Sequence, residues 1–398
     1  MARRPDAGLT GAKMHAAIVV LALLDLNGSV ALRGVNATGP ASWLEGGWGR
    51  LEAGGDEGEL LADAHLGVDW TSRHFGARVS GTGGRDAGGG YGGLVEAYVE
   101  GRVELGLDEL QLRAGQFFLP TSRENKDDLW RSPYTMSFSA LNSWIGEEVR
   151  PIGADLQYRH VTARGHAVTG GATAFRGNDT MGTLLAWRGW SSGSRLAAFG
   201  EVLPLPPLPS LPRYFPLQRE DGTQPFGRDL DGRTGYSARV RYSVPERANV
   251  QYTFIDNRGD RLLHRGEYAW ATHFHLVGAE AGDPDRLTVA AEYMTGSTGM
   301  GGGAAFVDAD FYATYVLVSQ KAGRSRFTAR YERFHTEERD FSAAESNAEQ
   351  GRAWTVAWLY DLRANVRVGA ELTRFTGARP GTPDPDARNV RLEARYRF

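Results

Sequence analysis

The sequence predicts an all-β fold: a transmembrane antiparallel β-barrel of 16–18 strands whose long loops fold inward. Three observations predict it. Apolar and charged residues alternate along most of the chain, short and long connections take turns, and the chain stops on an aromatic residue. Successive side chains of a strand point to opposite faces, so each segment has an apolar face and a charged face. In a membrane barrel the apolar face meets lipid and the charged face meets an aqueous interior.

The C-terminal segment 390–398 shows this alternation without a break. Val390, Leu392, Ala394, Tyr396 and Phe398 alternate with Arg391, Glu393, Arg395 and Arg397. Five further segments repeat the pattern: 94–105, 152–159, 236–244, 327–332 and 366–373. Their polar faces carry too many charges for a packed core, because a buried unpaired charge is costly. We therefore expect a water-filled interior.

The connections predict which end of the barrel faces the cell. Short turns are expected at 163–166, 191–194, 245–248, 321–324 and 361–364. Long loops are expected at 119–149, 204–233, 297–306 and 337–350, and the Gly-rich stretch 81–90 is interpreted as another outer loop. Short periplasmic turns and long outer loops are typical of outer-membrane barrels. Counting strands from segments near 43–53 and 61–71 gives eighteen; sixteen remains an alternative, since these two are the weakest segments.

Residues 1–31 have the features of a secretory signal peptide. Arg3, Arg4 and Lys13 precede the apolar run 16–24, and Ser29-Val30-Ala31 has the small-x-small shape of a cleavage site. Translation from Met1 or from Met14 fits the pattern, and a buried helix of the mature domain is the alternative. We expect residues 32–398 to form one barrel domain in the bacterial outer membrane. No apolar run approaches the ~18 residues that a membrane-spanning helix needs.

The expected inward faces carry more basic than acidic groups. The candidate pore-lining residues are Arg102, Arg113, Arg159, Arg239, Arg241, Arg330, Arg367, Arg391 and Arg395, joined by Arg397. Seven acidic residues oppose them: Glu96, Glu100, Glu104, Asp155, Glu332, Glu371 and Glu393. The loop 119–149 supplies the constriction candidates Arg123, Glu124, Lys126, Asp127, Asp128 and Arg131. Because arginine in a pore favours anions, these sets predict a channel with a mild anion preference.

Two segments resemble the porin O and P family, the phosphate-selective porin group of Gram-negative bacteria. They are 113–124, which reads RAGQFFLPTSRE, and 145–153, which reads IGEEVRPIG. In that family such segments lead into and out of a long inward loop. The resemblance implies a homotrimeric outer-membrane channel for small anionic solutes. Resemblance to the phosphate-selective members would also imply an arginine ladder in the pore backed by several loop lysines. In this chain Lys126 is the one lysine in a candidate pore loop.

Other classes of function leave weaker traces in the sequence. His264, His273 and His275 form the one histidine group, and it lacks a nucleophile motif or a third metal ligand. We therefore expect no enzyme, catalytic residue, metal or cofactor, and without a basic aromatic block no nucleic-acid partner. The expected partners are outer-membrane lipid, lipopolysaccharide and small anionic solutes. A closed adhesive or structural barrel, a barrel enzyme and a soluble β-sandwich remain the alternatives.

Overall fold

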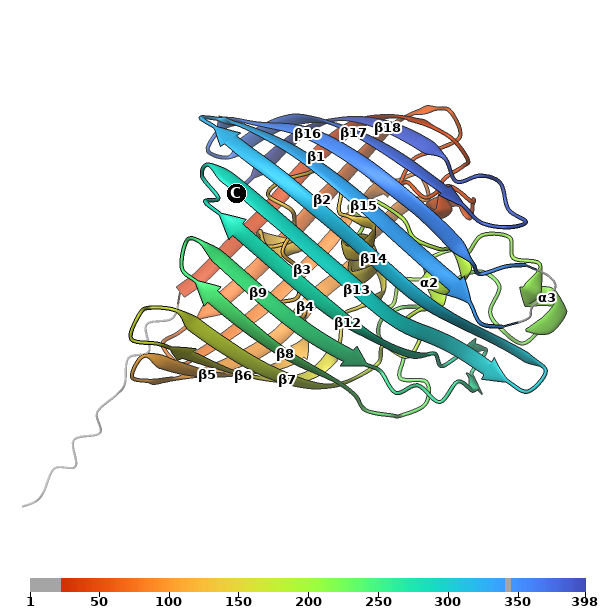
Figure 1. The fold of residues 1–398 in the computed structure, drawn as a ribbon, viewed down its shortest axis with the longest axis horizontal. Coiled ribbons are helices and arrows are strands. Elements are labelled where there is room, and N and C mark those ends of the chain that lie inside the picture. The colour runs from red at the N-terminus through yellow and green to blue at the C-terminus, as the bar shows by residue number, and fades with distance from the viewer. Residues whose placement is uncertain (1–22, 341–344) are drawn as a thin grey trace, which may run out of the picture.

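The computed structural model describes residues 23–340 and 345–398, which form a closed barrel of 16 antiparallel strands (Figure 1). Each strand pairs with its neighbours in the sequence of barrel strands, and β1 closes the ring by pairing with β18. The barrel strands are β1 (Leu23–Thr38), β2 (Gly58–Thr71), β3 (Phe75–Asp86), β4 (Gly89–Leu105), β5 (Asp108–Gln116), β6 (Ile152–Val161), β7 (Ala167–Arg176), β8 (Gly235–Val244), β9 (Ala248–Asp256), β12 (Ala271–Gly282), β13 (Leu287–Gly302), β14 (Ala305–Ala322), β15 (Ser325–Glu338), β16 (Glu349–Arg363), β17 (Val366–Ala378) and β18 (Ala387–Arg397). The predicted fold class is confirmed.

The remaining elements lie in the connections. Among the described residues there are three helices, α1 (Ala140–Glu148), α2 (Thr183–Trp187) and α3 (Ser210–Tyr214), and two short 3-10 segments, η1 (Trp43–Glu45) and η2 (Asp128–Trp130). A small hairpin of β10 (Leu263–His264) and β11 (Glu267–Tyr268) lies in the connection from β9 to β12. The described part of the chain contains no helix of the length and apolar character that a membrane crossing requires.

The two faces of the wall follow the alternation in the sequence. In β18, Arg391 and Glu393 are buried inside, whereas Val390 and Leu392 are exposed outside. Along β15 the same parity turns Arg330 and Glu332 inward. The short turns predicted after β6, β8, β14 and β16 are present, all at the periplasmic end by the usual barrel arrangement.

The strand count of eighteen is wrong and sixteen is correct. The segment near 43–53 is not a strand: η1 and a buried loop occupy it. A strand before it, β1, was missed because its first half, 23–31, was assigned to the signal peptide. Ser29 pairs with Arg397 in β18, and Leu23 through Ala31 pair with β2. The boundary at residue 31 therefore divides a barrel strand, while residues 1–22 of the predicted signal lie outside the described residues.

The long connections also differ from the predicted ones. No strand flanks 191–194, because 177–234 is one continuous connection between β7 and β8 that carries α2 and α3. Conversely, 297–306 is not a loop, since β13 and β14 extend through it and meet at Gly302 and Ala305. The Gly-rich stretch 81–90 is likewise mostly strand, with β3 and β4 paired up to Asp86 and Gly89. The loop 119–149 is a connection, as expected, and the predicted loop 337–350 is a shorter connection, because β15 ends at Glu338 and β16 begins at Glu349.

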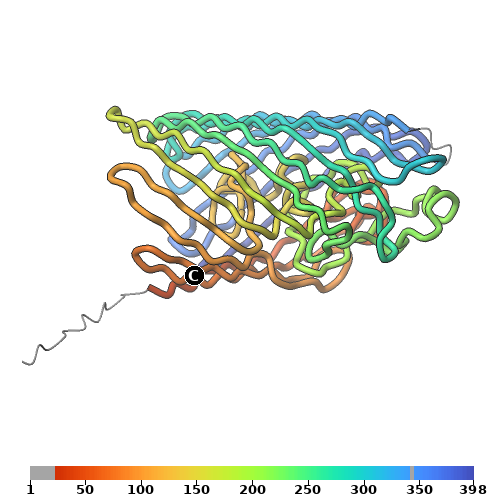
Figure 2. The backbone as a smooth tube through the Cα atoms, turned by 90° about the horizontal axis from the view of Figure 1, so that it is seen from below, coloured from red at the N-terminus to blue at the C-terminus, as the bar shows by residue number. Residues whose placement is uncertain are grey.

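The interior is filled rather than open along much of the wall, which corrects the expected water-filled lumen. Three connections, 39–57, 117–151 and 177–234, contribute buried residues to it. Figure 2 shows the orange-to-yellow segment of the chain inside the tube of strands. Inward-facing apolar wall residues such as Phe274, Phe311 and Phe334 are buried with Trp144 and Trp190 of these connections in one cluster. Such a core stabilises the inward loops by excluding apolar surface from water.

Candidate pore and constriction

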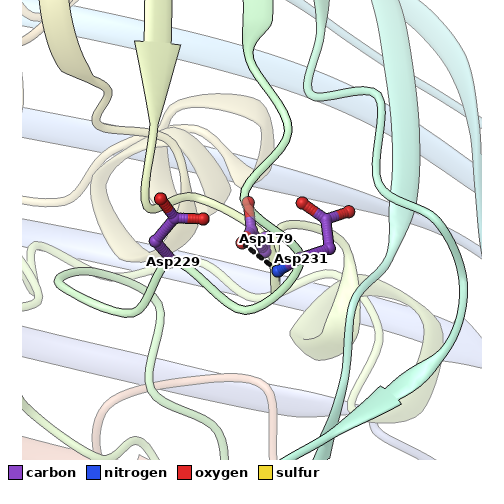
Figure 3. Close-up of side chains that lie close together, drawn as sticks. All are labelled: Asp179, Asp229 and Asp231. Carbon is purple, nitrogen blue, oxygen red and sulfur yellow. Dashed lines mark hydrogen bonds between the residues drawn. The ribbon is translucent and has the colours of Figure 1, made fainter.

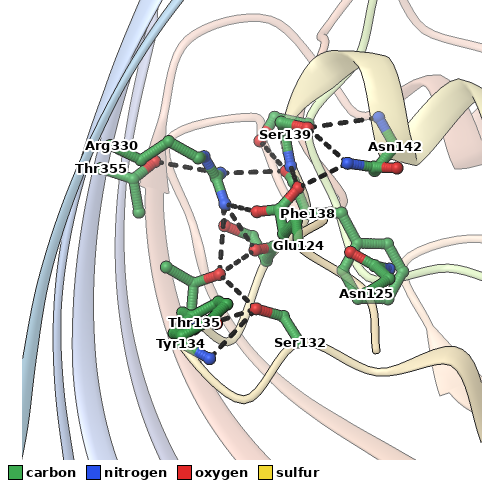
Figure 4. Close-up of polar contacts among 12 residues, drawn as sticks. Glu124, Asn125, Ser132, Tyr134, Thr135, Phe138, Ser139, Asn142, Arg330 and Thr355 are labelled. Carbon is green, nitrogen blue, oxygen red and sulfur yellow. Dashed lines mark hydrogen bonds and ion pairs between the residues drawn. The ribbon is translucent and has the colours of Figure 1, made fainter. Parts of the chain in front are cut away.

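The inward loop 117–151 is fixed to the barrel wall through Arg330 of β15. This side chain is fully buried, and its Nη1 donates to Glu124 Oε1 of the loop at 2.5 Å while its Nε donates to Glu332 Oε1 at 2.8 Å. The remaining N–H groups donate to loop carbonyls, those of Ser137 at 2.8 Å and Phe138 at 3.0 Å. Figure 4 shows the guanidinium at the centre of this network. A planar group with five donors is suited to holding a loop in one geometry.

Three glutamates of the wall bind backbone N–H groups of the same loop. Glu371 of β17 accepts from Met136 N at 2.7 Å, and Glu332 accepts from Ala140 N at 2.6 Å. Glu292 of β13 accepts from Arg123 N at 2.8 Å. The loop is thus tied to strands on one half of the barrel, and these carboxylates satisfy backbone groups that burial would otherwise leave unpaired.

The constriction candidates are separated by the fold. Glu124 is the wall contact described above, and Lys126 pairs with Glu280 of β12. Arg131 reaches the opposite side of the barrel, where it pairs with Asp63 of β2, and its burial lowers its pKa to about 10. Asp127 and Asp128 instead line a cavity of about 160 Å³.

That small cavity collects basic groups at the end of the barrel where the chain ends. Besides Asp127 and Asp128 it is lined by Arg131 and by three predicted pore arginines, Arg367, Arg395 and Arg397. Arg367 pairs with Asp361 at 2.7 Å and Arg395 with Glu393 at 3.0 Å. Burial raises the pKa of the Asp127 carboxyl. The acidic loop residues therefore lie among arginines, as opposed to forming a separate acidic constriction.

A second interior layer, formed by 39–57 and 177–234, was missed at the level of the sequence. Arg50 pairs with Glu349 of β16 at 3.1 Å, and Glu52 pairs with Arg391 of β18 at 3.1 Å. The sequence 183–190 looks like an apolar strand, but Trp187 and Trp190 are buried inside the barrel. Only their interior packing distinguishes them from lipid-facing residues.

Glu148 at the end of α1 joins the two interior layers. It is fully buried, accepts from Trp144 Nε1 at 2.6 Å, and accepts from Leu184 N at 2.9 Å and Gly182 N at 3.1 Å, at the start of α2. Burial raises the pKa of its carboxyl to about 7, although these donors oppose the shift. Its neighbour Glu147 has a cationic partner, Arg188, at 2.7 Å.

Arg150 lies between the rings of Phe118 and Phe226, 4.4 Å from each centroid. It is fully buried, and its nearest acceptors are carbonyls: Ala197 O at 2.7 Å and Gly146 O at 3.1 Å. Burial lowers its pKa to about 9. The stacking connects the inward loop to the connection 177–234 above it.

The predicted pore arginines divide into buried and accessible groups. Arg239, Arg330 and Arg391 are buried and paired, Arg239 with Asp155 at 2.6 Å. Arg102 and Arg113 are half-buried and share Glu100, at 2.6 and 3.3 Å, whereas Arg159 is exposed near the end of β6. The inward residues that retain solvent contact lie mainly on β3–β9, opposite the wall that the loops cover.

A cavity of about 550 Å³ lies beside the inward loop and reaches the turn 245–247. Arg123 and Arg241 both line it. Arg241 donates to Gln251 Oε1 at 2.8 Å and to Pro120 O at 3.0 Å; Arg123 donates to Asn249 Oδ1 at 2.7 Å and to Gln251 Oε1 at 3.1 Å. Among residues 23–340 and 345–398, neither guanidinium has a carboxylate oxygen within 4.0 Å. Two cations held by neutral acceptors thus face an accessible cavity.

The histidine group does not assemble a catalytic or metal site. His273 and His275 face outward from β12, where His273 contacts Ser297 Oγ at 3.3 Å and His275 contacts Tyr252 Oη at 2.8 Å. His264 lies in the β10–β11 hairpin and contacts Asp260 at 3.0 Å. Within the described ranges, no carboxylate pairs with the two β12 histidines.

Three aspartates meet in the connection between β7 and β8, as Figure 3 shows. Asp179, Asp229 and Asp231 each offer a carboxylate oxygen within 4.8 Å of the others. Backbone N–H groups already occupy part of this set, since Asp231 accepts from Asp260 N at 2.8 Å and Asp229 from Gly232 N at 2.8 Å. Burial raises the pKa of Asp179 to about 6. The cluster orders the loop through these turns.

Comparison with known proteins places the fold among outer-membrane channels. No protein-family model and no curated protein sequence matches this chain. Solved structures do: the outer-membrane channel DcaP of Acinetobacter baumannii has a TM-score of 0.58 at 12% identity, over 95% of this chain and 97% of that one. Salmonella typhi OmpF in complex with daunomycin has a TM-score of 0.55 at 10% identity, over 94% of this chain and 97% of that one. The anion-selective porin from Comamonas acidovorans has a TM-score of 0.53 at 12% identity, over 95% of this chain and 100% of that one.

At these identities the likeness concerns the fold alone. It extends over nearly the whole of the closed antiparallel barrel. The chain has the β-barrel fold of outer-membrane porins.

Proposed function

We propose that this protein is a passive diffusion channel for small hydrophilic solutes with a mild preference for anions. The observation that carries the proposal is the pair Arg123 and Arg241 at the 550 Å³ cavity. An arginine paired with a carboxylate presents little net charge to a solute, whereas one held by amide and carbonyl oxygens keeps its positive charge. Low-dielectric walls focus such a charge, and salt screens it over roughly 8–10 Å.

Phosphate selectivity is not part of this proposal. Lys126 pairs with Glu280, and Lys321, at the periplasmic end of β14, pairs with Asp285 at 2.5 Å. Neither lysine is left as a free cation toward the cavity. The accessible arginines Arg102 and Arg113 share one glutamate, which neutralises half of their combined positive charge.

Membership of the porin O and P family and a homotrimeric assembly are proposed with the channel. The two resembling segments lie at both ends of the inward loop, at the end of β5 and the start of β6. For the trimer, the support is a group of small outward residues on the outer half of β2–β6: Ala62, Ala64, Gly81, Gly83, Gly92, Ala97, Ala114 and Ala154. Aromatic residues, which normally ring the lipid-facing surface, line the outer half of β8–β16 instead.

The trimer can be tested with bulky substitutions on this small-residue face. Ala97→Phe and Ala114→Phe add volume on β4 and β5, and Ala329→Phe adds the same volume outward on β15 as the control. Light scattering of the detergent-solubilised protein should show a smaller trimer fraction for the first two variants alone. Equal trimer fractions in all three variants would place the contact elsewhere.

Solute uptake by proteoliposomes tests the channel itself. Vesicles containing the refolded chain should swell in small sugars and faster in a sugar acid than in a cationic amino sugar of the same size. Arg241→Gln should reduce the difference between the two charged solutes, and Arg176→Gln, which changes an outward residue, should not. Swelling that is indifferent to charge would remove the anion preference and leave a general channel.

One observation favours a second candidate, a closed structural or adhesive barrel. Trp144, Trp187 and Trp190 are fully buried inside the barrel, and the loops cover the walls of β12–β18. If these contacts persist in the membrane, the polar track on β3–β9 does not extend across it. If vesicles with a correctly folded barrel do not swell, the protein is a closed structural or adhesive barrel and not a channel.

A further inference from the structure

Four arginines form a contiguous cluster on the outside of the barrel. Arg333 of β15, Arg352 of β16, Arg374 of β17 and Arg388 of β18 are all exposed, and the parity of each strand turns them away from the interior. Arg333 lies directly opposite Arg352, and Arg374 lies directly opposite Arg388. Arg352 is opposite Thr376, two residues from Arg374, so the two pairs are diagonal neighbours. We call these four residues the outer arginine cluster.

This arrangement is unfavourable for the isolated chain. Side chains directly opposite on antiparallel strands have Cβ atoms roughly 4.5–5.5 Å apart, and like charges there are destabilising. None of the four guanidiniums has a carboxylate oxygen within 4.0 Å in the described parts of the chain. The arginines inside the barrel are mostly paired, as with Arg330 and Arg391. The outer arginine cluster is therefore a concentration of positive charge without an internal counter-charge.

The cluster marks the outer edge of the lipid-facing band. Tyr331 and Trp354 are in contact, with ring centroids 4.4 Å apart and planes tilted by 43°, and Trp354 lies opposite Arg374. The next outward residues toward the periplasm are exposed and apolar, among them Val356, Leu372 and Val390. On the other side the strands end in the long-loop connections 339–348 and 379–386. Aromatic residues mark the membrane interface in such barrels, so the arginines lie at headgroup depth of the outer leaflet.

The surface is also hollowed at this position. A groove of about 640 Å³ is lined by Arg333 and Arg352 together with Tyr312, Tyr331 and the backbone of Gly351 and Gly377. One acidic residue, Asp386, lines it, and its Oδ1 already accepts from Gly377 N at 3.0 Å. The groove therefore combines two cations, three aromatic rings (Phe334 is the third) and a low backbone floor beside the apolar band.

We propose that the outer arginine cluster and this groove bind the phosphorylated headgroup of lipopolysaccharide in the outer leaflet. Guanidinium groups bind phosphate through paired, charge-assisted hydrogen bonds. A phosphate bound between opposed arginines neutralises their repulsion, and the acyl chains continue along the exposed apolar residues below. Inorganic phosphate satisfies the charge but not the apolar band, which is why the lipid is the occupant. The inference depends on the membrane orientation of the barrel and not on whether it conducts.

The test compares the removal of outward arginines inside the cluster with the removal of outward arginines elsewhere on the barrel. The variant Arg333→Gln/Arg352→Gln/Arg374→Gln/Arg388→Gln removes the cluster; Arg85→Gln/Arg176→Gln changes two outward arginines on β3 and β7 as the control. Each chain is purified from outer membranes in mild detergent, and lipopolysaccharide per folded protomer is measured by native mass spectrometry. Retention should fall several-fold in the quadruple variant and stay unchanged in the control. Conductance and heat-modifiability report folding, and either double variant, at Arg333/Arg352 or at Arg374/Arg388, replaces a quadruple variant that fails to fold.

Thermal unfolding of the refolded wild-type chain distinguishes the source of the phosphate. Phosphorylated lipopolysaccharide should raise the melting temperature, and dephosphorylated lipopolysaccharide or inorganic phosphate should raise it much less. Equal effects of the two lipids, equal retention by the quadruple variant, or a full effect of inorganic phosphate alone would overturn the proposal. A loss of trimer with unchanged lipid would also overturn it, because the cluster would then be a contact between protomers.

Discussion

Arg330 illustrates how single buried charges position the interior of this barrel. It contacts loop and wall at once, through Glu124, Glu332 and two loop carbonyls. The alternation along 327–332 predicted that it faces inward, and it does. Its partner could not be predicted, because Glu124 lies about two hundred residues away and only the path of the loop brings the two together. Sequence periodicity gives the direction of a side chain and not its access to solvent.

Replacing Arg330 should release the inward loop. Arg330→Gln leaves two buried carboxylates without their cation, a change that typically costs about 3–5 kcal/mol. We expect a lower free energy of unfolding and a larger, noisier single-channel conductance. Arg85→Gln, which changes an exposed outward arginine on β3 outside the outer arginine cluster, serves as the control. A variant with normal stability and unchanged conductance would show that the other loop contacts suffice.

Glu148 should make the packing of α1 on α2 depend on pH. Its pKa is raised to about 7 in the folded chain; the ordinary value of a glutamate is about 4.3. The folded form therefore holds the proton over a range in which the opened form has lost it, so stability decreases as pH rises from about 4.5 to 7. The stabilisation that protonated Glu148 provides is fully present below this pH window and is lost above it.

Hydrogen exchange at Gly182 and Leu184, corrected for the intrinsic rate, measures this effect. The opening free energy of the α2 amides should fall between pH 5 and pH 8, and Glu148→Gln should flatten the profile because the amide does not titrate. Glu147→Gln, which removes a carboxylate paired with Arg188, is the comparison. A profile in Glu148→Gln as steep as in the wild-type chain would assign the dependence to another group.

At the scale of elements, the sequence predicted the presence of strands better than the residues at which they begin and end. Segments with strict alternation, such as 236–244 and 366–373, are strands, and 119–149 is an inward connection. The failures share a physical cause. The apolar run 16–24 resembles a signal peptide, yet its last residues, Leu23 and Leu24, belong to β1. The predicted turn 191–194 requires a strand before it, yet the apolar stretch there, with Trp187 and Trp190, is interior core. Glycine-rich strand ends, as in 297–306, resemble loops because glycine permits both.

The N-terminal half of β1 should be required for closing the barrel. Gly28 exchanges hydrogen bonds with Phe398, at 2.9 and 3.0 Å, so the first half of β1 pairs with the last residue of the chain. A chain that begins at residue 32 leaves backbone groups of β2 and β18 unpaired in the membrane, each at a cost of several kcal/mol. Compared with a chain that begins at residue 23, it should give less heat-modifiable barrel on refolding. Equal yields would show that residues 23–31 are dispensable.

At the scale of the whole molecule, the barrel is divided into a covered half and an accessible half. The loops pack against β12–β18, and the accessible polar residues lie mainly on β3–β9. The fold, the strand parity and the existence of an inward loop followed from the sequence. The division did not, because it depends on which charges the loops cover: Arg391 and Arg241 look alike in the sequence, but one is buried against Glu52 and the other lines the cavity.

The central claim is that Arg123 and Arg241 give the accessible path an anion preference. The most direct measurement is the reversal potential of single channels in planar bilayers under a KCl gradient, for the wild-type chain and for Arg123→Gln/Arg241→Gln. We predict stable conductance steps with a chloride-favouring potential that moves toward zero in the double variant. No steps from a correctly folded barrel, or a cation-favouring potential that the double variant leaves unchanged, would contradict the account.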